Sequence, residues 1–252
     1  MPKKKITSMK AVVLGAGMGS RLSEITRHIP KTMIRIHKKY IFETIIESLA
    51  EVGIGEIVFV VGYKRNELIP LIKKTCKNVN VKIKFVSNPR YKETNTMYSL
   101  WLARDHLNSS LLYLHGDLIF SVKMLEEFLM SPSRNAILVD RSFPLDWDDA
   151  MKVISHKDKI KYISKAITVH EMDGVAIGIY KFDKRGVDEL FCIVDRLIKK
   201  GVKKSWISEA MNILSKSVKI KAEFNRDHPW VDVDNLSDFN IAHEIWNRIE
   251  NE

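Results

Sequence analysis

Cysteine is scarce in this sequence, and its scarcity excludes several kinds of chemistry. Among 252 residues only Cys76 and Cys192 occur, and neither belongs to a CxxC pair or stands beside a cluster of histidines. Structural zinc sites and thiol redox sites need such clusters, so we expect neither of them here. Both cysteines are expected to be unpaired thiols.

Long apolar runs are also missing. No stretch approaches the roughly 20 apolar residues that a membrane-spanning helix needs. The first ten residues, MPKKKITSMK, lack the apolar stretch of a secretory signal. We therefore expect a soluble, cytoplasmic protein that does not insert into a membrane.

Basic residues outnumber acidic ones, 41 against 31, and give a formal net charge of +10 at pH 7. Such an excess of positive charge can bind nucleic acid, an anionic membrane or small anionic substrates. The lysines are spread over several separate segments, and no recognised nucleic-acid-binding motif accompanies them. The pattern favours a solvated basic surface, so no nucleic-acid partner is expected.

Short apolar β-branched runs alternate with amphipathic stretches through the first half of the chain. The expected strands are 11–14, 56–61, 81–86, 110–115 and 136–139, and the expected helices are 40–52, 66–75, 96–107 and 122–129. This alternation predicts a Rossmann-like α/β fold with a mostly parallel sheet and helices on both of its faces.

The second half of the chain has a different pattern. Its expected strands are 151–155, 160–164, 175–182 and 218–224, and its expected helices are 184–199, 205–214 and 236–249. We found no repeats and no low-complexity linker. The length and a hydrophobic content of 45% suit one domain over residues 1–252, in which a mixed α/β half from about 141 follows a first half of about 9–140.

A glycine-rich loop, Gly15–Gly19, follows the first expected strand and its last residue, Leu14. Glycines there allow a sharp turn and bring backbone N–H groups close to phosphate oxygens. Because Ser20 follows Gly19, the spacing is not G-x-G-x-x-G, and no Lys-Ser/Thr pair of a Walker motif follows. The loop therefore argues against a nicotinamide cofactor and against a P-loop ATPase.

Two basic residues accompany this loop. Arg21 lies just beyond the glycines and suits a forked grip on the β- and γ-phosphates of a nucleotide. Lys31 follows Pro30 and, as a compact charge, suits the α-phosphate, where negative charge builds during attack. The simpler alternative is a tight turn that carries two surface cations.

The loop resembles that of the sugar-nucleotide pyrophosphorylase and cytidylyltransferase superfamily. Gly15, Gly17 and Arg21 match its glycine-rich loop, and Pro30 and Lys31 match the Pro-Lys pair that follows. The resemblance implies a magnesium-dependent transfer of a nucleotidyl group to a phosphorylated acceptor, with release of pyrophosphate. It also implies a nucleotide-binding first half and an acceptor-binding second half.

Further segments are similar to one branch of that superfamily, the CTP-dependent enzymes that activate phosphocholine, 2-aminoethylphosphonate and similar compounds. The similar segments are 88–99, 150–153, 176–182, 206–210 and 230–234. CTP and a small phosphorylated acceptor are therefore the expected substrates. The alternatives are a sugar-1-phosphate or polyol-phosphate nucleotidyltransferase that uses UTP, dTTP, GTP or CTP, and a module that binds a nucleotide without turnover.

Three aspartates are candidate ligands of Mg²⁺. Asp117 follows the strand 110–115, at the edge where open α/β sheets gather their ligands, while Asp232 and Asp234 alternate along an extended segment. Mg²⁺ prefers one or two such carboxylates together with phosphate oxygens and water. Asp232 departs from the branch pattern, which usually has Glu there. Alternatively, Asp117 forms a turn and the other two cap the last helix, although Asn235 and Ser237 can do that capping.

Candidate nucleotide-binding residues follow from the loop and from the resemblance. They are Leu14, Gly15, Ala16, Gly17, Met18, Gly19, Arg21, Lys31, Gly62, Asn88, Thr94 and Asn95. Among them Lys31 and Arg21 are the expected catalytic residues. The amide and hydroxyl side chains of Asn88, Thr94 and Asn95 suit the edge of a pyrimidine base, although they equally suit the acceptor.

The acceptor is expected to meet the second half of the chain. The resemblance makes Lys152 the cation that holds its phosphate, and the further candidates are Tyr98, Asp117, Trp147 and Glu209. Acidic and aromatic side chains together suit an ammonium group, so an amine-bearing acceptor is expected. Trp147 and Trp206 can equally serve as packing residues.

Overall fold

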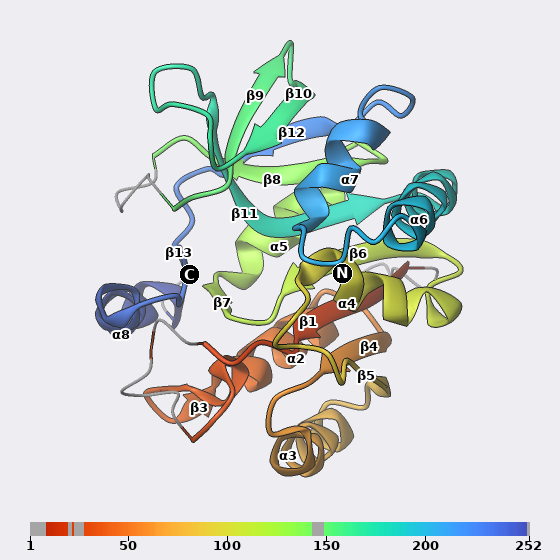
Figure 1. Cartoon of the computed structure of the whole chain (residues 1–252). Coiled ribbons are helices and arrows are strands. Elements are labelled where there is room, and N and C mark those ends of the chain that lie inside the picture. The colour runs from red at the N-terminus through yellow and green to blue at the C-terminus, as the bar shows by residue number, and fades with distance from the viewer. Residues whose placement is uncertain (1–8, 20–21, 23–27, 143–148, 251–252) are drawn as a thin grey trace.

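The computed structural model describes residues 9–19, 22, 28–142 and 149–250. Its main sheet is nine-stranded and contains β1 (Met9–Gly15), β4 (Glu56–Val61), β5 (Lys82–Ser87), β6 (Ser110–His115), β8 (Ala136–Asp140), β9 (Lys152–His156), β10 (Lys159–Ser164), β11 (Gly174–Phe182) and β12 (Lys221–Phe224). The order across the sheet is β5-β4-β1-β6-β11-β8-β12-β10-β9 (Figure 1).

Two short two-stranded sheets and a set of helices complete the described part of the chain. The small sheets pair β2 (Arg35–Ile36) with β3 (Lys39–Tyr40) and β7 (Leu118–Phe120) with β13 (Trp230–Asp232). The helices are α2 (Ile41–Glu51), α3 (Arg65–Asn78), α4 (Thr96–Ala103), α5 (Val122–Met130), α6 (Lys184–Lys199), α7 (Ile207–Leu214) and α8 (Leu236–Glu250), with 3₁₀ turns η2 (Lys31–Met33) and η3 (Arg104–His106).

The main sheet is mixed, so the prediction of a mostly parallel sheet is wrong. Strands β5, β4, β1 and β6 are parallel to one another, as predicted for the first half. Strand β11 then runs antiparallel between β6 and β8, and β10 pairs antiparallel with β9 and β12. The alternation of strands and helices indicates which segments are extended, but strand direction depends on pairings between distant segments that no local pattern encodes.

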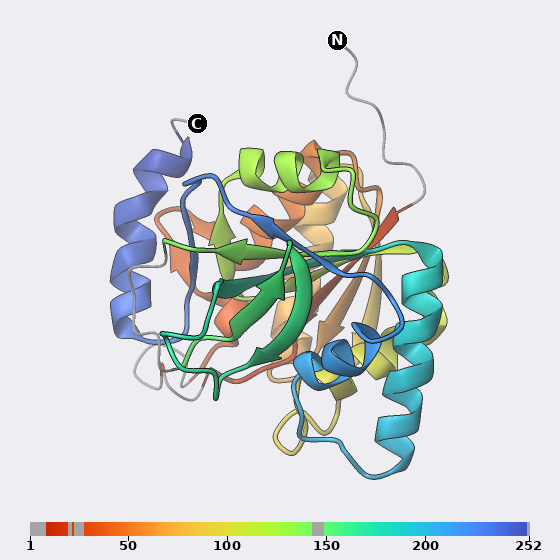
Figure 2. The ribbon, with the colours of Figure 1, turned by 90° about the horizontal axis from the view of Figure 1, so that it is seen from above.

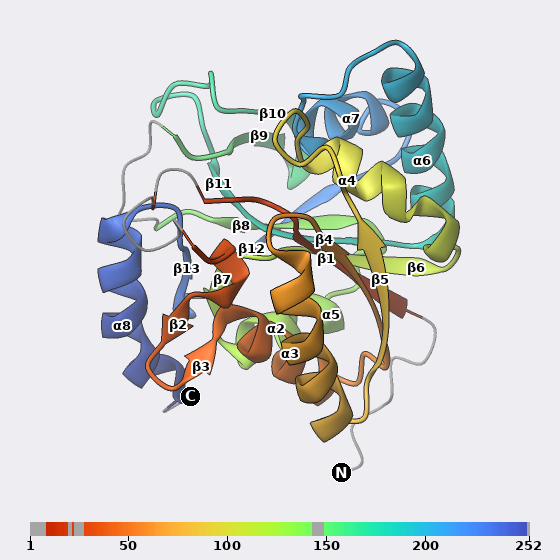
Figure 3. The same cartoon turned by 60° about the horizontal axis from the view of Figure 1, so that its bottom comes forward.

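Helices cover both faces of the sheet, as the sequence predicts (Figure 3). In β1 the side chains alternate, so that Ala11 and Val13 belong to the apolar cluster that includes α2, α3, α5 and α8, whereas Val12 belongs to the cluster that includes α4, α6 and α7. Burial on both faces explains why this strand is a continuous apolar run. Helices α8 and α6 lie at opposite ends of the molecule (Figure 2).

Most predicted elements agree with the structure, and the misses are short. Strands 56–61 and 110–115 and helix 184–199 have the predicted limits, whereas β12 begins three residues later than predicted. The sequence analysis missed the short strands β2, β3, β7 and β13, which form by pairing β2 with β3 and β7 with β13, and Tyr40, predicted to begin a helix, ends β3. Among the described residues, no helix is both long and apolar enough to cross a membrane.

Candidate active site

A cavity of about 470 Å³ opens beside the carboxyl ends of β1 and β6. These ends lie side by side because Leu14 pairs with His115 across the two parallel strands. The predicted site residues that line the cavity are Leu14, Gly15, Ala16, Gly17, Gly19, Lys31, Asn88, Thr94, Asn95, Asp117, Asp232 and Asp234. The structure thus brings together most of the predicted nucleotide and metal residues, which are spread over the whole chain.

Other predicted residues lie elsewhere. Among the described residues, Met18, Gly62, Tyr98, Lys152 and Glu209 are not part of the cavity lining. Two further candidates, Arg21 and Trp147, lie outside the described residues. The binding roles assigned to these seven residues remain predictions.

Gly62 holds the glycine-rich loop against β4. A Cβ atom at position 62 would lie 2.7 Å from the carbonyl oxygen of Ala16 and 2.9 Å from Cβ of Tyr91. The neighbouring backbone N–H of Tyr63 donates to that same oxygen at 3.2 Å. The absence of a side chain at Gly62 therefore lets the loop approach the strand, which explains the glycine without a contact to a base.

The three aspartates meet although they are far apart in the sequence. Asp117 follows β6, while Asp232 ends β13, which pairs with β7 so that Asp232 lies opposite Leu118. In addition, the N–H of Val233 donates to the backbone oxygen of Asp117 at 3.1 Å. The pairing of two three-residue strands therefore places the aspartates of the C-terminal segment beside the end of β6.

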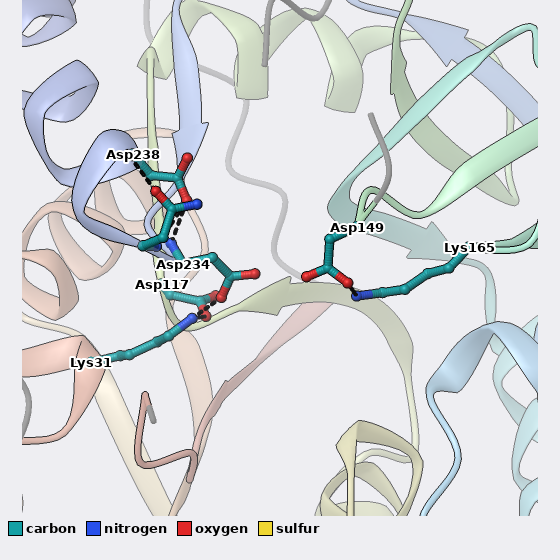
Figure 4. A network of polar contacts seen from close by, with 7 residues as sticks. Lys31, Asp117, Asp149, Lys165, Asp234 and Asp238 are labelled. Atoms are coloured by element: carbon teal, nitrogen blue, oxygen red, sulfur yellow. Dashed lines mark hydrogen bonds and ion pairs between the residues drawn. The ribbon is translucent and has the colours of Figure 1, made fainter. Parts of the chain in front are cut away.

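Lys31 connects two of these carboxylates (Figure 4). Its Nζ donates to Oδ2 of Asp117 at 3.1 Å and forms an ion pair with Oδ1 of Asp234. The side chain of Lys31 is only 12% exposed. Burial favours the neutral amine, but the carboxylates of Asp117, Asp232 and Asp234 outweigh it and raise the pKa of Lys31, so the ammonium persists.

The last helix is capped without the carboxylate of Asp234. Oδ2 of Asp238 accepts from the N–H groups of Asp234 and Asn235 at 2.9 and 3.0 Å. Oδ1 of Asn235 accepts from the N–H of Asp238 at 3.1 Å, which completes a reciprocal cap at the start of α8. Asn235 thus caps the helix, as the sequence suggested, with Asp238 in place of Ser237, and the carboxylate of Asp234 is directed to Lys31.

The other two aspartates have opposite pKa shifts. Burial and the carboxylates of Asp117 and Asp234 raise the pKa of Asp232 well above its ordinary value. Burial also opposes the ionisation of Asp117, but Lys31 and His115 outweigh it and lower the pKa of Asp117. The pair therefore shares one proton more readily than it holds two negative charges.

The site fits a divalent cation. Oδ1 of Asp232 is buried and accepts no hydrogen bond from any residue that the structure describes. A buried carboxylate oxygen without a partner is costly, and a bound cation would satisfy it. Asp117, Asp232 and Asp234 supply the hard oxygen ligands that Mg²⁺ requires.

The structure adds a cation that the sequence analysis did not select. Lys165, directly after β10, lines the cavity, and its Nζ donates to Oδ1 of Asp149 at 2.5 Å (Figure 4). The same amine lies 5.0 Å from the centre of the Trp206 ring, which is 44% exposed. Lys165 was missed because Ser-Lys-Ala is an ordinary surface sequence, and only the fold places it opposite the aspartates.

Lys152 lies beneath this group. It is 3% exposed, and its Nζ donates to the backbone oxygen of Lys165 at 2.9 Å. In the structure, Lys152 therefore supports the backbone from which Lys165 reaches the cavity. Whether Lys152 also meets the acceptor, as the resemblance implies, stays a prediction.

The segment 88–99 is held by its own polar side chains. Nδ2 of Asn88 donates to Oγ1 of Thr94 and to Oγ of Ser99, both at 3.0 Å, and Asn88 is 1% exposed. Oδ1 of Asn95 caps α4 by accepting from the N–H of Thr96 at 2.8 Å. These residues line the cavity, but the hydrogen bonds show that they also shape it.

Several known proteins are similar to this chain. CTP:phosphoglutamine cytidylyltransferase from Campylobacter jejuni is 24% identical over 258 residues, which cover 94% of this chain and 100% of the relative. CMP-5'-(3-aminopropyl)phosphonate synthase from Streptomyces rubellomurinus is 35% identical over 133 residues, covering 53% of this chain but only 21% of the relative. Choline-phosphate cytidylyltransferase from Streptococcus pneumoniae is 35% identical over 102 residues, covering 40% of this chain and 42% of the relative.

Solved structures share the fold. The structure of CTP:phosphocholine cytidylyltransferase from Streptococcus pneumoniae has a TM-score of 0.76 at 21% identity, and the match covers 94% of this chain and 99% of that chain. The inositol-1-phosphate CTP transferase from T. maritima has a TM-score of 0.79 at 19% identity, with 96% and 98% covered. The family described as nucleotidyl transferase matches residues 10–139, about half of the sequence, and the chain therefore belongs to this family.

Proposed function

We propose that this nucleotidyl transferase is a CTP-dependent cytidylyltransferase. It would transfer CMP from CTP to a small phosphate or phosphonate acceptor and release pyrophosphate. The names of the three relatives above all describe cytidylyl chemistry, on phosphoglutamine, an aminopropylphosphonate and choline phosphate. The observation that supports catalysis is the position of Lys31 between Asp117 and Asp234 at the wall of the cavity.

We assign the nucleotide to the first half of a single domain over residues 1–252. In this proposal the loop 15–19 binds the phosphates through its N–H groups, and Arg21 assists Lys31. Asn88, Thr94 and Asn95 lie on the wall of the same cavity, where they suit the base of CTP. Residues from 141 onward provide the acceptor side.

The chemistry needs no covalent intermediate with the protein. An oxygen of the acceptor's phosphate or phosphonate attacks the α-phosphorus of CTP and forms a new P–O bond, while the bond to the β-phosphate breaks and pyrophosphate leaves. Lys31 would turn from the aspartates toward the α-phosphate, whose negative charge grows during attack. A Mg²⁺ ion held by Asp117, Asp234 and Asp232 would neutralise phosphate charge when bound.

The acceptor's phosphate is assigned to Lys165. Its side chain is 25% exposed at the cavity wall, and its amine pairs with Asp149, which orients it. Trp206 lies beside it with an exposed ring face, and a ring next to a carboxylate suits the ammonium of an amine-bearing acceptor. Lys152 would act on the acceptor through the backbone of Lys165.

Pyrophosphate release over a matrix of nucleotides and acceptors tests the proposal. CTP should exceed UTP, dTTP, GTP and ATP at matched concentrations, with phosphocholine, 2-aminoethylphosphonate and sugar 1-phosphates as acceptors. Asp117→Ala should abolish release without unfolding the protein, whereas Asp188→Ala, on the exposed face of α6, should not change it. Better turnover with UTP or dTTP and a sugar phosphate would show that the protein is a sugar-1-phosphate nucleotidyltransferase. Full activity in excess chelator would refute metal dependence.

A further inference from the structure

A histidine joins the aspartates at the carboxyl end of β6. One ligand atom each of His115, Asp117 and Asp232 lies within 4.8 Å of the others. Two atoms bound to one cation at about 2.1–2.2 Å are at most about 4.4 Å apart. The three ligand atoms therefore lie near enough for an adjustment of the side chains to bring them onto one ion.

Strand β11 leaves space for the imidazole of His115. Strand β11 has an irregular register between Ala176 and Tyr180, and Gly178 within that stretch has a φ of +91°. A Cβ atom at Gly178 would lie only 2.7 Å from Nδ1 of His115. The left-handed backbone and the missing side chain at Gly178 therefore make room for the ring.

Aromatic neighbours restrict the ring further. The imidazole meets Tyr113 edge-on, with 5.6 Å between ring centres, and Tyr180 in the same way at 6.4 Å. A ring held between β6 and β11 in this way has little freedom to turn away from the aspartates. The geometry is thus preorganised, which lowers the cost of binding an ion.

A second observation at the same place points to an ion. As described above, Oδ1 of Asp232 is buried and has no hydrogen-bond partner among the described residues. Asp117 contacts Lys31 through Oδ2 and belongs to the same group as His115 and Asp232. An ion bound by this group would therefore satisfy the orphaned oxygen of Asp232.

We propose that His115 is a protein ligand, with Asp117 and Asp232, of the divalent cation that serves the proposed transfer, and that this nitrogen ligand makes the site prefer Mn²⁺ or Co²⁺ to Mg²⁺. Mg²⁺ takes oxygen ligands almost exclusively, whereas an imidazole ligand adds affinity for first-row transition metals, least for Mn²⁺ and more for Co²⁺. This inference rests on the proposed function only for the role of the bound cation, because metal binding itself can be measured without turnover.

The test measures Mn²⁺ binding to the tag-free protein by electron paramagnetic resonance, in the absence of nucleotide. Free Mn²⁺ gives the affinity, and pulsed measurements detect a directly bound imidazole nitrogen. The wild type and His170→Gln, an exposed histidine outside the cavity lining, should show this nitrogen. His115→Gln should lose the nitrogen signal and bind Mn²⁺ at least about tenfold more weakly. Even the loss of a residue that only hydrogen-bonds to a metal ligand lowers metal affinity by about tenfold. The Mg²⁺ affinity of His115→Gln should not change.

A second variant perturbs the ring without removing it. Gly178→Ala places a methyl group against His115, so the nitrogen coupling should weaken while the oxygen ligands remain. An all-oxygen Mn²⁺ spectrum of the wild type would overturn the proposal, even if both variants failed to fold. An unchanged spectrum and affinity in folded His115→Gln would do the same.

The two proposals fail separately. If no nucleotide supports pyrophosphate release but the nitrogen signal depends on His115, the proposed function falls and the metal ligand stands. If CTP is used with any divalent cation and the wild type lacks the nitrogen signal, His115 is not a ligand although the proposed function holds.

Discussion

The amine of Lys31 lies where a cation would lie, between the carboxylates of Asp117 and Asp234. It donates to Asp117 at 3.1 Å and pairs with Asp234 at a site where Lys31 is 12% exposed. Lys31 and a divalent ion therefore compete for the negative charge of Asp117, which both proposals assign to the ion. A nucleotide would relieve this competition, because its α-phosphate offers Lys31 another negative partner.

Replacing Lys31 should separate metal affinity from catalysis. In Lys31→Met, removal of the competing ammonium should strengthen Mn²⁺ binding in the absence of nucleotide, while loss of charge at the α-phosphate should lower kcat by about 10²–10³. Calorimetry gives the first quantity and pyrophosphate release the second. Lys39→Met, on exposed β3, is the control and should alter neither. A weaker Mn²⁺ affinity in Lys31→Met would contradict competition.

Lys165 and Lys152 should give different phenotypes. Lys165→Met should raise the acceptor KM by about tenfold to a hundredfold, the loss expected for one charge-assisted hydrogen bond, with CTP affinity unchanged. Lys152→Met removes the buried hydrogen bond from Nζ of Lys152 to the backbone oxygen of Lys165, so it should lower the free energy of unfolding by about 1–3 kcal/mol. Thermal unfolding and steady-state kinetics measure both. If Lys152 itself holds the acceptor's phosphate, its variant will show the larger KM increase.

Metal binding should weaken as the pH falls. Burial and two neighbouring carboxylates raise the pKa of Asp232, so the folded protein keeps this proton at pH values where an ordinary aspartate is ionised. Raising the pH through that pKa removes the proton that competes with the cation, and affinity should increase. Calorimetry in buffers of different ionisation enthalpy should detect proton release on Mn²⁺ binding. In Asp232→Asn the release should disappear, and equal release in both proteins would count against this assignment.

The pKa of Asp232 has a further effect on folding. Its folded pKa exceeds the ordinary value of 3.8, so the folded state binds the proton more tightly than the unfolded state does. The contribution of Asp232 to the free energy of unfolding is therefore largest at low pH and is lost as the pH rises through the folded pKa. The stability difference between wild type and Asp232→Asn should follow this trend in denaturant titrations.

The two thiols should react at very different rates. Cys192 is exposed on α6, whereas Cys76 is 3% exposed and burial raises its pKa to about 11. At pH 8 a disulfide reagent should modify one thiol quickly, and that fast phase should vanish in Cys192→Ser but not in Cys76→Ser. Denaturant should expose both. Two fast thiols in the native protein would show that α3 opens readily.

The sequence by itself determined the local features of this protein. Apolar periodicity located most helices and strands, because burial on one or both faces leaves a repeat of known period. Gly15, Lys31, Asp117 and Asp234 stood out because their motifs depend on neighbouring residues, and the structure places all four at one cavity. These signals are short-range, so they can be seen without the fold.

Only the tertiary structure decided what depends on distant segments. The antiparallel insertion of β11 and the pairing of β7 with β13 join residues that no local pattern connects. His115 gained its proposed role in the same way, since its neighbours Asp232 and Gly178 come from other strands. Strand pairing and side-chain contact are set by the packing of the whole chain, and that packing brings these side chains together.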